Sequence, residues 1–123
     1  MRLLLLNANT SEFVTERVAT FARTMARSDT EIVARHSSFG AHIISTRTEL
    51  AIAEHATLDA LAHHADGFDA VVLAVSYDTA LTAAREMLSI PVVGITEAAL
   101  LTACMLGTTT GVVMFGKRVL PLY

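Results

Sequence analysis

The stretch that most constrains the fold runs from residue 69 to residue 85, because the spacing of its apolar residues changes abruptly in the middle. Residues 70–75 are an unbroken apolar run, too short for a helix and rich in valine, which predicts a parallel strand buried on both faces. After the polar residues 76–79, apolar residues recur at helical spacing. The stretch therefore predicts a strand, a polar turn and a helix.

The same unit repeats along the chain and predicts a parallel α/β sheet. We expect strands at 2–6, 30–35, 70–75, 92–95 and 110–115, and helices at 12–25, from 46 or 48 to 65, at 81–88 and at 96–106. In the first helix, an apolar stripe is expected to face the sheet, formed by Val14, Val18, Phe21 and Met25. In the fourth helix, Leu101, Cys104 and Met105 are expected to point inward, with Cys104 as a packing residue.

Composition excludes several classes of protein. A chain of 123 residues with 53% hydrophobic content can bury a core as one domain, and no apolar run approaches the roughly 18 residues of a membrane span. The net charge of −3 and the scattered basic residues argue against nucleic acid. The single cysteine, Cys104, cannot form an internal disulfide, so we expect a cytoplasmic protein. No two of the histidines on the expected second helix have metal-binding spacing, so no metal site is predicted.

Polar residues follow the predicted strands, and in a parallel sheet these strand ends meet at one edge. They include Asn7 and Asn9 after the first strand, residues 76–79 after the third, and Glu97 with Thr96 after the fourth. The first turn contains no glycine, so neither a Walker loop nor a dinucleotide fingerprint is present. Hydroxyls, amides and helix N-termini at one edge would suit a small carboxylate or a ureide.

Four segments carry a resemblance to a known family. Residues 7–11 resemble an opening Asn-Pro-Asn-Thr/Ser turn, and Asp78 with the following Ala-Ala-Arg-Glu resembles the segment after a third strand. Residues 91–99 resemble a fourth strand and helix start, and residues 111–116 resemble the first strand of a second lobe. Together these segments are similar to the Asp/Glu/hydantoin racemase superfamily.

The resemblance implies two similar α/β lobes around a substrate cleft, with no metal or organic cofactor. We expect residues 1–107 to form the first lobe, a flavodoxin-like parallel four-stranded sheet with helices on both faces, and residues 108–123 to begin an incomplete second lobe with a fifth strand. In the family each lobe donates one cysteine for proton transfer at the α-carbon. Here Val75 and Ser76 stand where the first thiol is expected.

The predicted site combines the strand ends with this resemblance. We expect Ser76 and Asp78 to be catalytic, and the substrate-binding residues to be Asn7, Asn9, Val75, Tyr77, Thr79, Glu97, Phe115 and Gly116. The favoured hypothesis is a cofactor-independent racemase or isomerase of a small amino-acid or hydantoin-like substrate, with this chain supplying one wall of the cleft. The alternative is a non-catalytic fragment, or a module for small-carboxylate binding or for assembly that lacks the catalytic cysteines. Homo-oligomers are expected, because an uncovered apolar face favours self-association.

Overall fold

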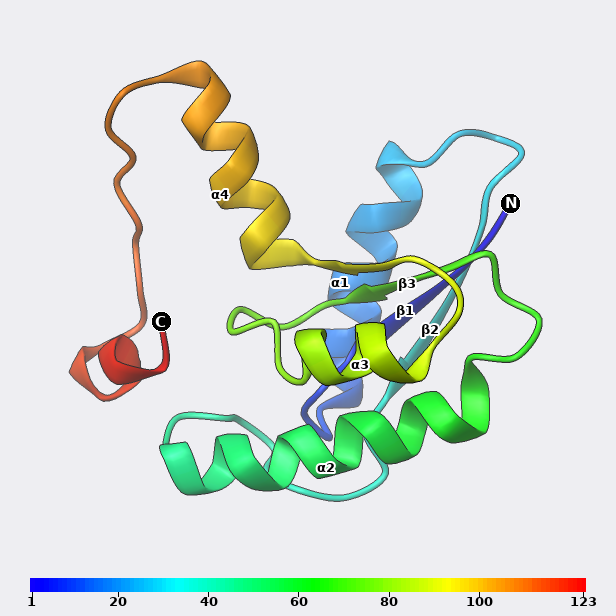
Figure 1. Cartoon of the computed structure of the whole chain (residues 1–123), viewed down its shortest axis with the longest axis horizontal. Helices are drawn as coiled ribbons and strands as arrows, with labels where there is room; N and C mark the ends of the chain where they lie inside the picture. Colours follow the sequence, from blue (N-terminus) through cyan, green and yellow to red (C-terminus); the bar gives the residue numbers. More distant parts are fainter.

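The computed structural model describes residues 1–123, and its centre is a sheet of four parallel strands (Figure 1). The strands are β1 (Arg2–Asn7), β2 (Glu31–His36), β3 (Ala70–Leu73) and β4 (Val92–Gly94). The helices are α1 (Glu12–Met25), α2 (Arg47–His64), α3 (Leu81–Met87) and α4 (Ile95–Leu106), and a 3₁₀ helix, η1 (Lys117–Leu122), lies near the end. The α/β class and the four-stranded parallel sheet are confirmed.

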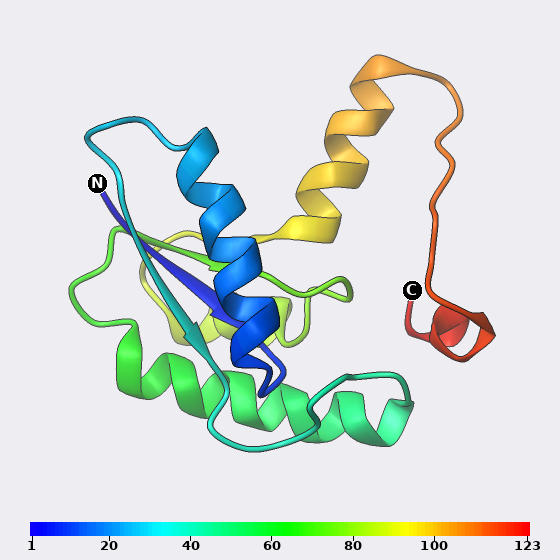
Figure 2. The same cartoon turned by 180° about the vertical axis from the view of Figure 1, so that it is seen from behind.

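Helices cover both faces of the sheet, as predicted. Alternate side chains of the central strands point towards α2 and α3, and they form the main core together with Leu61 and Ala84. The strand residues of this core are Leu4, Leu6, Val71, Leu73 and Val92. Helix α1 lies on the opposite face, over β2 and β1, as the two opposed views show (Figures 1 and 2). Near-continuous apolar runs are what a sheet covered on both faces requires.

The strand order β2-β1-β3-β4 places a reversal of direction at the centre of the sheet. From β1 the chain crosses through α1 to β2 on one side, whereas β3 lies on the other side of β1, with Leu6 beside Leu73. Ligands of open α/β sheets bind beyond the carboxyl ends of the strands at such a reversal. The fold therefore directs attention to the turns that follow β1 and β3.

The predicted inner stripe of α1 is only half right. Val14 and Val18 are half-buried, but Phe21 and Met25 are exposed, and the residues buried against the sheet are Thr15 and Ala19. Thr15 is drawn inward because its hydroxyl accepts a hydrogen bond from the buried Asn7 side chain. This contact fixes the rotation of α1 about its axis, so small residues face the sheet and the large apolar ones lie outside.

The predicted fifth strand is wrong. Residues 107–116 pair with no strand and residues 117–122 form η1. Helix α4 leads the chain away from the sheet, and the segment that follows does not join the sheet (Figure 1). The inward face predicted for α4 is also wrong, because the helix has no buried residue and Leu101, Cys104 and Met105 are all exposed.

One part of the sheet has no helix above it. On the α1 face, α1 covers β2 and β1, but Val93 of the edge strand β4 is 39% exposed. Helix α4 does not fold back over this region but projects from the end of β4 (Figure 2). No helix of the structure combines the length and apolarity needed to cross a bilayer.

Candidate functional site

Three turns meet at the carboxyl edge of the sheet, as predicted. The register places Leu6 beside Leu73 and Leu73 beside Gly94, so the chain leaves β1, β3 and β4 at the same level. The Ala74 N–H donates to the Leu6 carbonyl and carries the pairing one residue further. The residues that follow each strand therefore face a common space.

The turn after β1 is held by a network of amide side chains. Asn7 is buried, and its side-chain nitrogen donates to the Asn9 Oδ1 at 2.8 Å and to the Thr15 Oγ1 at 3.0 Å. The Asn7 Oδ1 accepts from the Asn9 N–H, and the Asn9 Oδ1 accepts from the Ser11 N–H. Asn7 thus shapes the turn from within, whereas the half-buried Asn9 keeps its side-chain nitrogen available to a ligand.

The turn after β3 is strained. Asp78 and Ala80 have positive φ angles of 47° and 62°, although neither is glycine. Between them Thr79 is 2% exposed, and its hydroxyl has no hydrogen-bond partner. Left-handed backbone and an unpartnered buried hydroxyl both cost free energy, and such features gather at functional sites.

The same turn presents unused backbone donors. The N–H of Asp78 donates to the Val75 carbonyl, but the N–H groups of Ser76, Tyr77 and Thr79 donate to no other backbone carbonyl. The Ser76 side chain is exposed, beside these amides. Successive free N–H groups in a turn with left-handed residues form concavities that bind anions.

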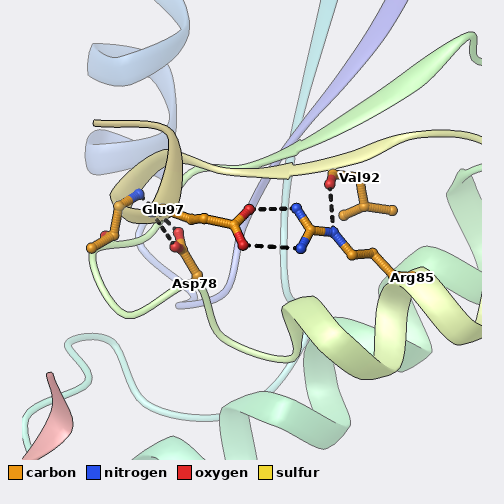
Figure 3. Close-up of polar contacts among 5 residues, drawn as sticks. Asp78, Arg85, Val92 and Glu97 are labelled. Carbon is orange, nitrogen blue, oxygen red and sulfur yellow. Dashed lines mark hydrogen bonds and ion pairs between the residues drawn. The ribbon is translucent and has the colours of Figure 1, made fainter. Parts of the chain in front are cut away.

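Asp78 connects this turn to α4 (Figure 3). Its Oδ1 accepts a hydrogen bond from the Thr96 N–H at 2.9 Å, and its Oδ2 accepts one from the Glu97 N–H at 2.6 Å. A carboxylate in this position satisfies free N–H groups of the helix and complements its dipole. Gly94 leaves the required space, because a Cβ there would overlap the Asp78 carboxyl group.

A second contact holds α4 from the side of α3. The two terminal nitrogens of the Arg85 guanidinium group donate to the Glu97 carboxylate, at 3.1 and 2.5 Å. The third nitrogen, Nε, donates to the Val92 carbonyl (Figure 3). These hydrogen bonds lower the pKa of Glu97 below its ordinary value and raise that of Arg85. Glu97 therefore faces Arg85 and not the space beyond β3.

Tyr77 forms the apolar side of the site. Its hydroxyl donates to the Ile44 carbonyl at 3.2 Å. Its ring packs edge to face against the ring of Tyr123, with 5.1 Å between the ring centroids. Burial, and then the nearby Tyr123, raise the pKa of the Tyr77 phenol, so it stays a hydrogen-bond donor at neutral pH. A hollow of about 270 Å³ opens here, which is lined by Ser76, Tyr77, Thr96, Leu100, Val112, Met114, Leu122 and Tyr123.

Not all predicted residues gather at this hollow. Ser76 and Tyr77 line it, Val75 is buried beneath the turn against Ala8, and Phe115 and Gly116 lie outside. Phe115 is 97% exposed because the strand expected to position it does not form. Cys104 is exposed on α4 and is not among the lining residues.

Sequence reasoning missed three residues that shape the site. Arg85 and Gly94 fix α4, and Tyr123 closes the hollow. The strand-to-helix junction at Gly94 carried a signal, because a glycine directly before a helix often marks a close contact. Nothing in the sequence pattern indicates that Tyr123 contacts Tyr77.

Comparison with known proteins places the chain in a family. Residues 3–123 match the family model "Asp/Glu/Hydantoin racemase". The chain is 32% identical over 120 residues to the hydantoin racemase of Pseudomonas sp. (strain NS671). The aligned residues are 97% of this chain and 48% of that protein. The chain therefore belongs to the Asp/Glu/hydantoin racemase family, as the sequence motifs indicated.

Three further racemases are similar to this chain. The hydantoin racemase of Paenarthrobacter aurescens is 32% identical over 121 residues, which are 97% of this chain and 51% of that protein. The crystal structure of allantoin racemase from Pseudomonas fluorescens superposes with a TM-score of 0.95 at 38% identity, covering 99% of this chain and 52% of that one. Allantoin racemase from Klebsiella pneumoniae gives a TM-score of 0.81 at 38% identity, over 85% and 43% of the two chains. This chain spans about half the length of the relatives that it matches.

Proposed function

We propose that this chain forms one wall of the active site of a cofactor-independent racemase that acts on a hydantoin-type ureide. Family membership supports racemase chemistry, and the named relatives act on hydantoin and allantoin, which share a five-membered ureide ring. The observation that carries the proposal is the turn after β3, where free N–H groups stand beside the exposed Ser76 hydroxyl.

The geometry suits removal of a proton next to a carbonyl. When a base takes the proton from carbon 5 of a hydantoin, the electron pair of the C–H bond moves into the ring and negative charge develops on the neighbouring carbonyl oxygen. No group of this wall is assigned as that base, so the rest of the active site would have to supply it. Backbone N–H groups already held in place stabilise such an oxygen without rearranging during the reaction. The N–H groups of Ser76 and Tyr77, which donate to no backbone carbonyl, would take this role, and the apolar hollow beside Tyr77 would receive the substituent on carbon 5.

We assign different roles to Ser76 and Asp78. Ser76 lines the hollow and is exposed, so we assign its hydroxyl to contact with the substrate. The Asp78 carboxylate is occupied by two N–H groups of α4, so Asp78 acts as a positioning residue that holds the turn. Asn9 contributes its free side-chain amide from the turn after β1.

A second candidate function has one observation in its favour. The turn after β3 carries no thiol, and Cys104 lies exposed on α4. A protein that binds the ureide ring without exchanging its proton would need the same N–H groups but no proton-transfer residue. This candidate is a binding module for small ureides.

The experiment incubates the protein with single enantiomers of 5-benzylhydantoin in deuterated buffer, and follows optical rotation and the carbon 5 proton by NMR. Deuterium uptake faster than the buffer blank, together with loss of rotation, supports the racemase. Amide shifts at Ser76, Tyr77 and Thr79 without proton exchange support the binding module and reject a racemase whose proton transfer needs only this wall. No shift and no exchange reject both.

Two controls make the result specific. 5,5-Dimethylhydantoin has the same ring but no proton on carbon 5, so it should shift the same amides without exchange. The Ser76→Ala variant keeps every N–H group and removes one hydroxyl. We expect it to lower the exchange rate about tenfold or more, which is the effect of losing one hydrogen bond to a developing charge.

A further inference from the structure

The loop between β2 and α2, residues 37–46, runs from the carboxyl edge of the sheet to the start of α2 (Figure 2). It contacts both turns of the candidate site. The Thr10 N–H, in the turn after β1, donates to the Ala41 carbonyl of this loop at 3.2 Å. The Tyr77 hydroxyl, in the turn after β3, donates to its Ile44 carbonyl. No residue of the loop lines the hollow, so the loop would act on a substrate through these two turns.

Ile44 is the buried centre of the loop. It is 4% exposed and packs in a small apolar cluster with Ala8, Ala53 and Val75. Ala8 belongs to the turn after β1, and Val75 directly precedes Ser76. This packing places the Ile44 side chain, whereas the direction of the Ile44 carbonyl depends on the peptide unit that follows.

That one peptide unit joins Tyr77 to Glu49. The Ile44 carbonyl and the Ser45 N–H belong to the same planar trans unit, in which the two groups point in opposite directions. The carbonyl accepts from the Tyr77 hydroxyl at 3.2 Å, and the N–H donates to the Glu49 Oε2 at 2.7 Å. A carboxylate that fixes the N–H therefore also fixes the direction of the carbonyl.

The contacts of Glu49 differ from those of an ordinary helix cap. Thr46 caps α2, and its Oγ1 accepts from the Glu49 N–H at 3.2 Å. In the usual capping box, the acidic residue accepts in return from the N–H of the cap residue. Here the Glu49 Oε2 accepts instead from the N–H and the hydroxyl of Ser45, one residue earlier. These hydrogen bonds lower the pKa of Glu49 below its ordinary value, so the carboxylate stays charged at neutral pH.

We propose that Glu49 is a positioning residue for the turn after β3, because it holds the Tyr77 hydroxyl through the peptide unit between Ile44 and Ser45. Hydrogen bonds to a carboxylate are stronger than those between neutral groups, so the start of α2 sets the position of the loop beneath Tyr77. The effect on a substrate rests on the proposed function, in which Tyr77 forms the apolar side of the ureide site.

The first test follows Tyr77 without any ligand. The chain has two tyrosines, so Tyr123→Phe leaves Tyr77 as the only one and keeps the ring that packs against it. With isotope-labelled tyrosine, this variant gives one set of ring signals by NMR. We expect Glu49→Ala to move these signals towards their position in the urea-unfolded chain. Glu49→Gln should leave them in place, because its amide oxygen can accept the same hydrogen bonds.

Thr46→Ala is the matched control. It removes the cap of α2 and so weakens the same end of the helix, but it leaves Ser45 bound to Glu49. We expect the Tyr77 signals to stay in place in this variant. Unmoved signals in Glu49→Ala would overturn the proposal. An equal movement in Thr46→Ala would also overturn it, because any weakening of the start of α2 would then be enough.

The second test measures ligand binding in the chain that keeps Tyr123. Titration with 5,5-dimethylhydantoin, followed by backbone amide shifts, gives a dissociation constant. We expect Glu49→Ala to raise it about fivefold, which corresponds to one hydrogen bond, and Thr46→Ala to leave it unchanged. If the unaltered chain binds no ureide, the proposed function fails, while the tyrosine signals still decide whether Glu49 positions Tyr77. If the unaltered chain binds and Glu49→Ala binds equally well, the proposed function stands and the role of Glu49 in the site is overturned.

Discussion

At the scale of single residues, Asp78 is the most constrained position of the site. Its backbone is left-handed at a φ of 47°, and both of its carboxylate oxygens accept hydrogen bonds from α4. Gly94 lies directly against this carboxyl group. The conformation of the turn after β3 therefore depends on two residues that do not belong to it, Gly94 and Thr96.

Gly94→Ala should show this dependence. The added Cβ would overlap the Asp78 carboxyl group, which must then move away from the N–H groups of Thr96 and Glu97. We expect a loss of about 1–3 kcal/mol in the free energy of unfolding, which is typical of overpacking. Urea denaturation measures the loss, and unchanged stability would contradict the close contact. Gly111→Ala is the control, because a Cβ there meets nothing within 4 Å.

Ala80→Gly should have the opposite effect. Ala80 has a φ of 62°, a conformation that costs an alanine roughly 1 kcal/mol and a glycine almost nothing. We expect the free energy of unfolding to rise by up to about 0.5 kcal/mol, because the relieved strain slightly exceeds the cost of the greater flexibility of glycine in the unfolded chain. Thermal unfolding checks this prediction. Ala83→Gly, in the regular part of α3, should instead lower stability.

The sequence allowed the turns at the sheet edge to be predicted, but not all of their contacts. Residues 76–79 were identifiable because the apolar period changes there and a polar run interrupts it. The partners of Asp78 could not be predicted, since Thr96 and Glu97 lie 18 and 19 residues further along. Likewise, the stripe of α1 was misplaced because a buried hydrogen bond to Thr15 decided the rotation of the helix.

At the scale of elements, α4 begins in an unusual way. No side chain of its own first turn caps it, and β4 passes into it without a loop. Asp78 from the turn after β3 serves as the cap, and Arg85 from α3 holds Glu97. Two neighbouring elements thus fix the direction of a helix that buries none of its own side chains.

The Arg85–Glu97 pair should make the start of α4 sensitive to acid. The pKa of Glu97 is lowered in the folded protein, so the pair stabilises the fold above pH 4.5, the ordinary value, and this contribution is lost as the pH falls below it. We expect amide hydrogen exchange in residues 95–98 to become faster, relative to the core of β3, as the pH falls. In Glu97→Gln this relative change should disappear. A pH-independent ratio in the unaltered protein would contradict the prediction.

At the scale of the whole molecule, the core is unevenly distributed. The buried side chains concentrate between the sheet and helices α2 and α3, whereas α4 and residues 107–123 bury almost none. The four strands and helix α1 were predictable from apolar runs and periodicity, whereas α2 buries mostly small residues and has little amphipathic pattern. The lack of a strand at residues 110–115 was not predictable. A strand requires a neighbouring strand, and the sequence does not reveal that α4 leads away from the sheet.

Substitutions should reveal this uneven distribution. Leu73→Ala removes a buried side chain of β3 and should cost about 2–5 kcal/mol of unfolding free energy. Leu101→Ala and Met105→Ala alter exposed residues of α4, and each should change stability by less than about 0.5 kcal/mol. Chemical denaturation of the three variants provides the comparison. A large loss for either α4 variant would show that α4 has a packing partner in solution.

Because no loop separates β4 from α4, a small change of angle at their junction moves the far end of the helix. It extends for twelve residues, or about 18 Å, and the contacts with Asp78 and Arg85 hold only its first turn. A tilt of about ten degrees at Ile95 would swing its far end by roughly 3 Å. Because Tyr123 returns from beyond that end to touch Tyr77, small pivoting motions at the edge strand would open or narrow the mouth of the hollow.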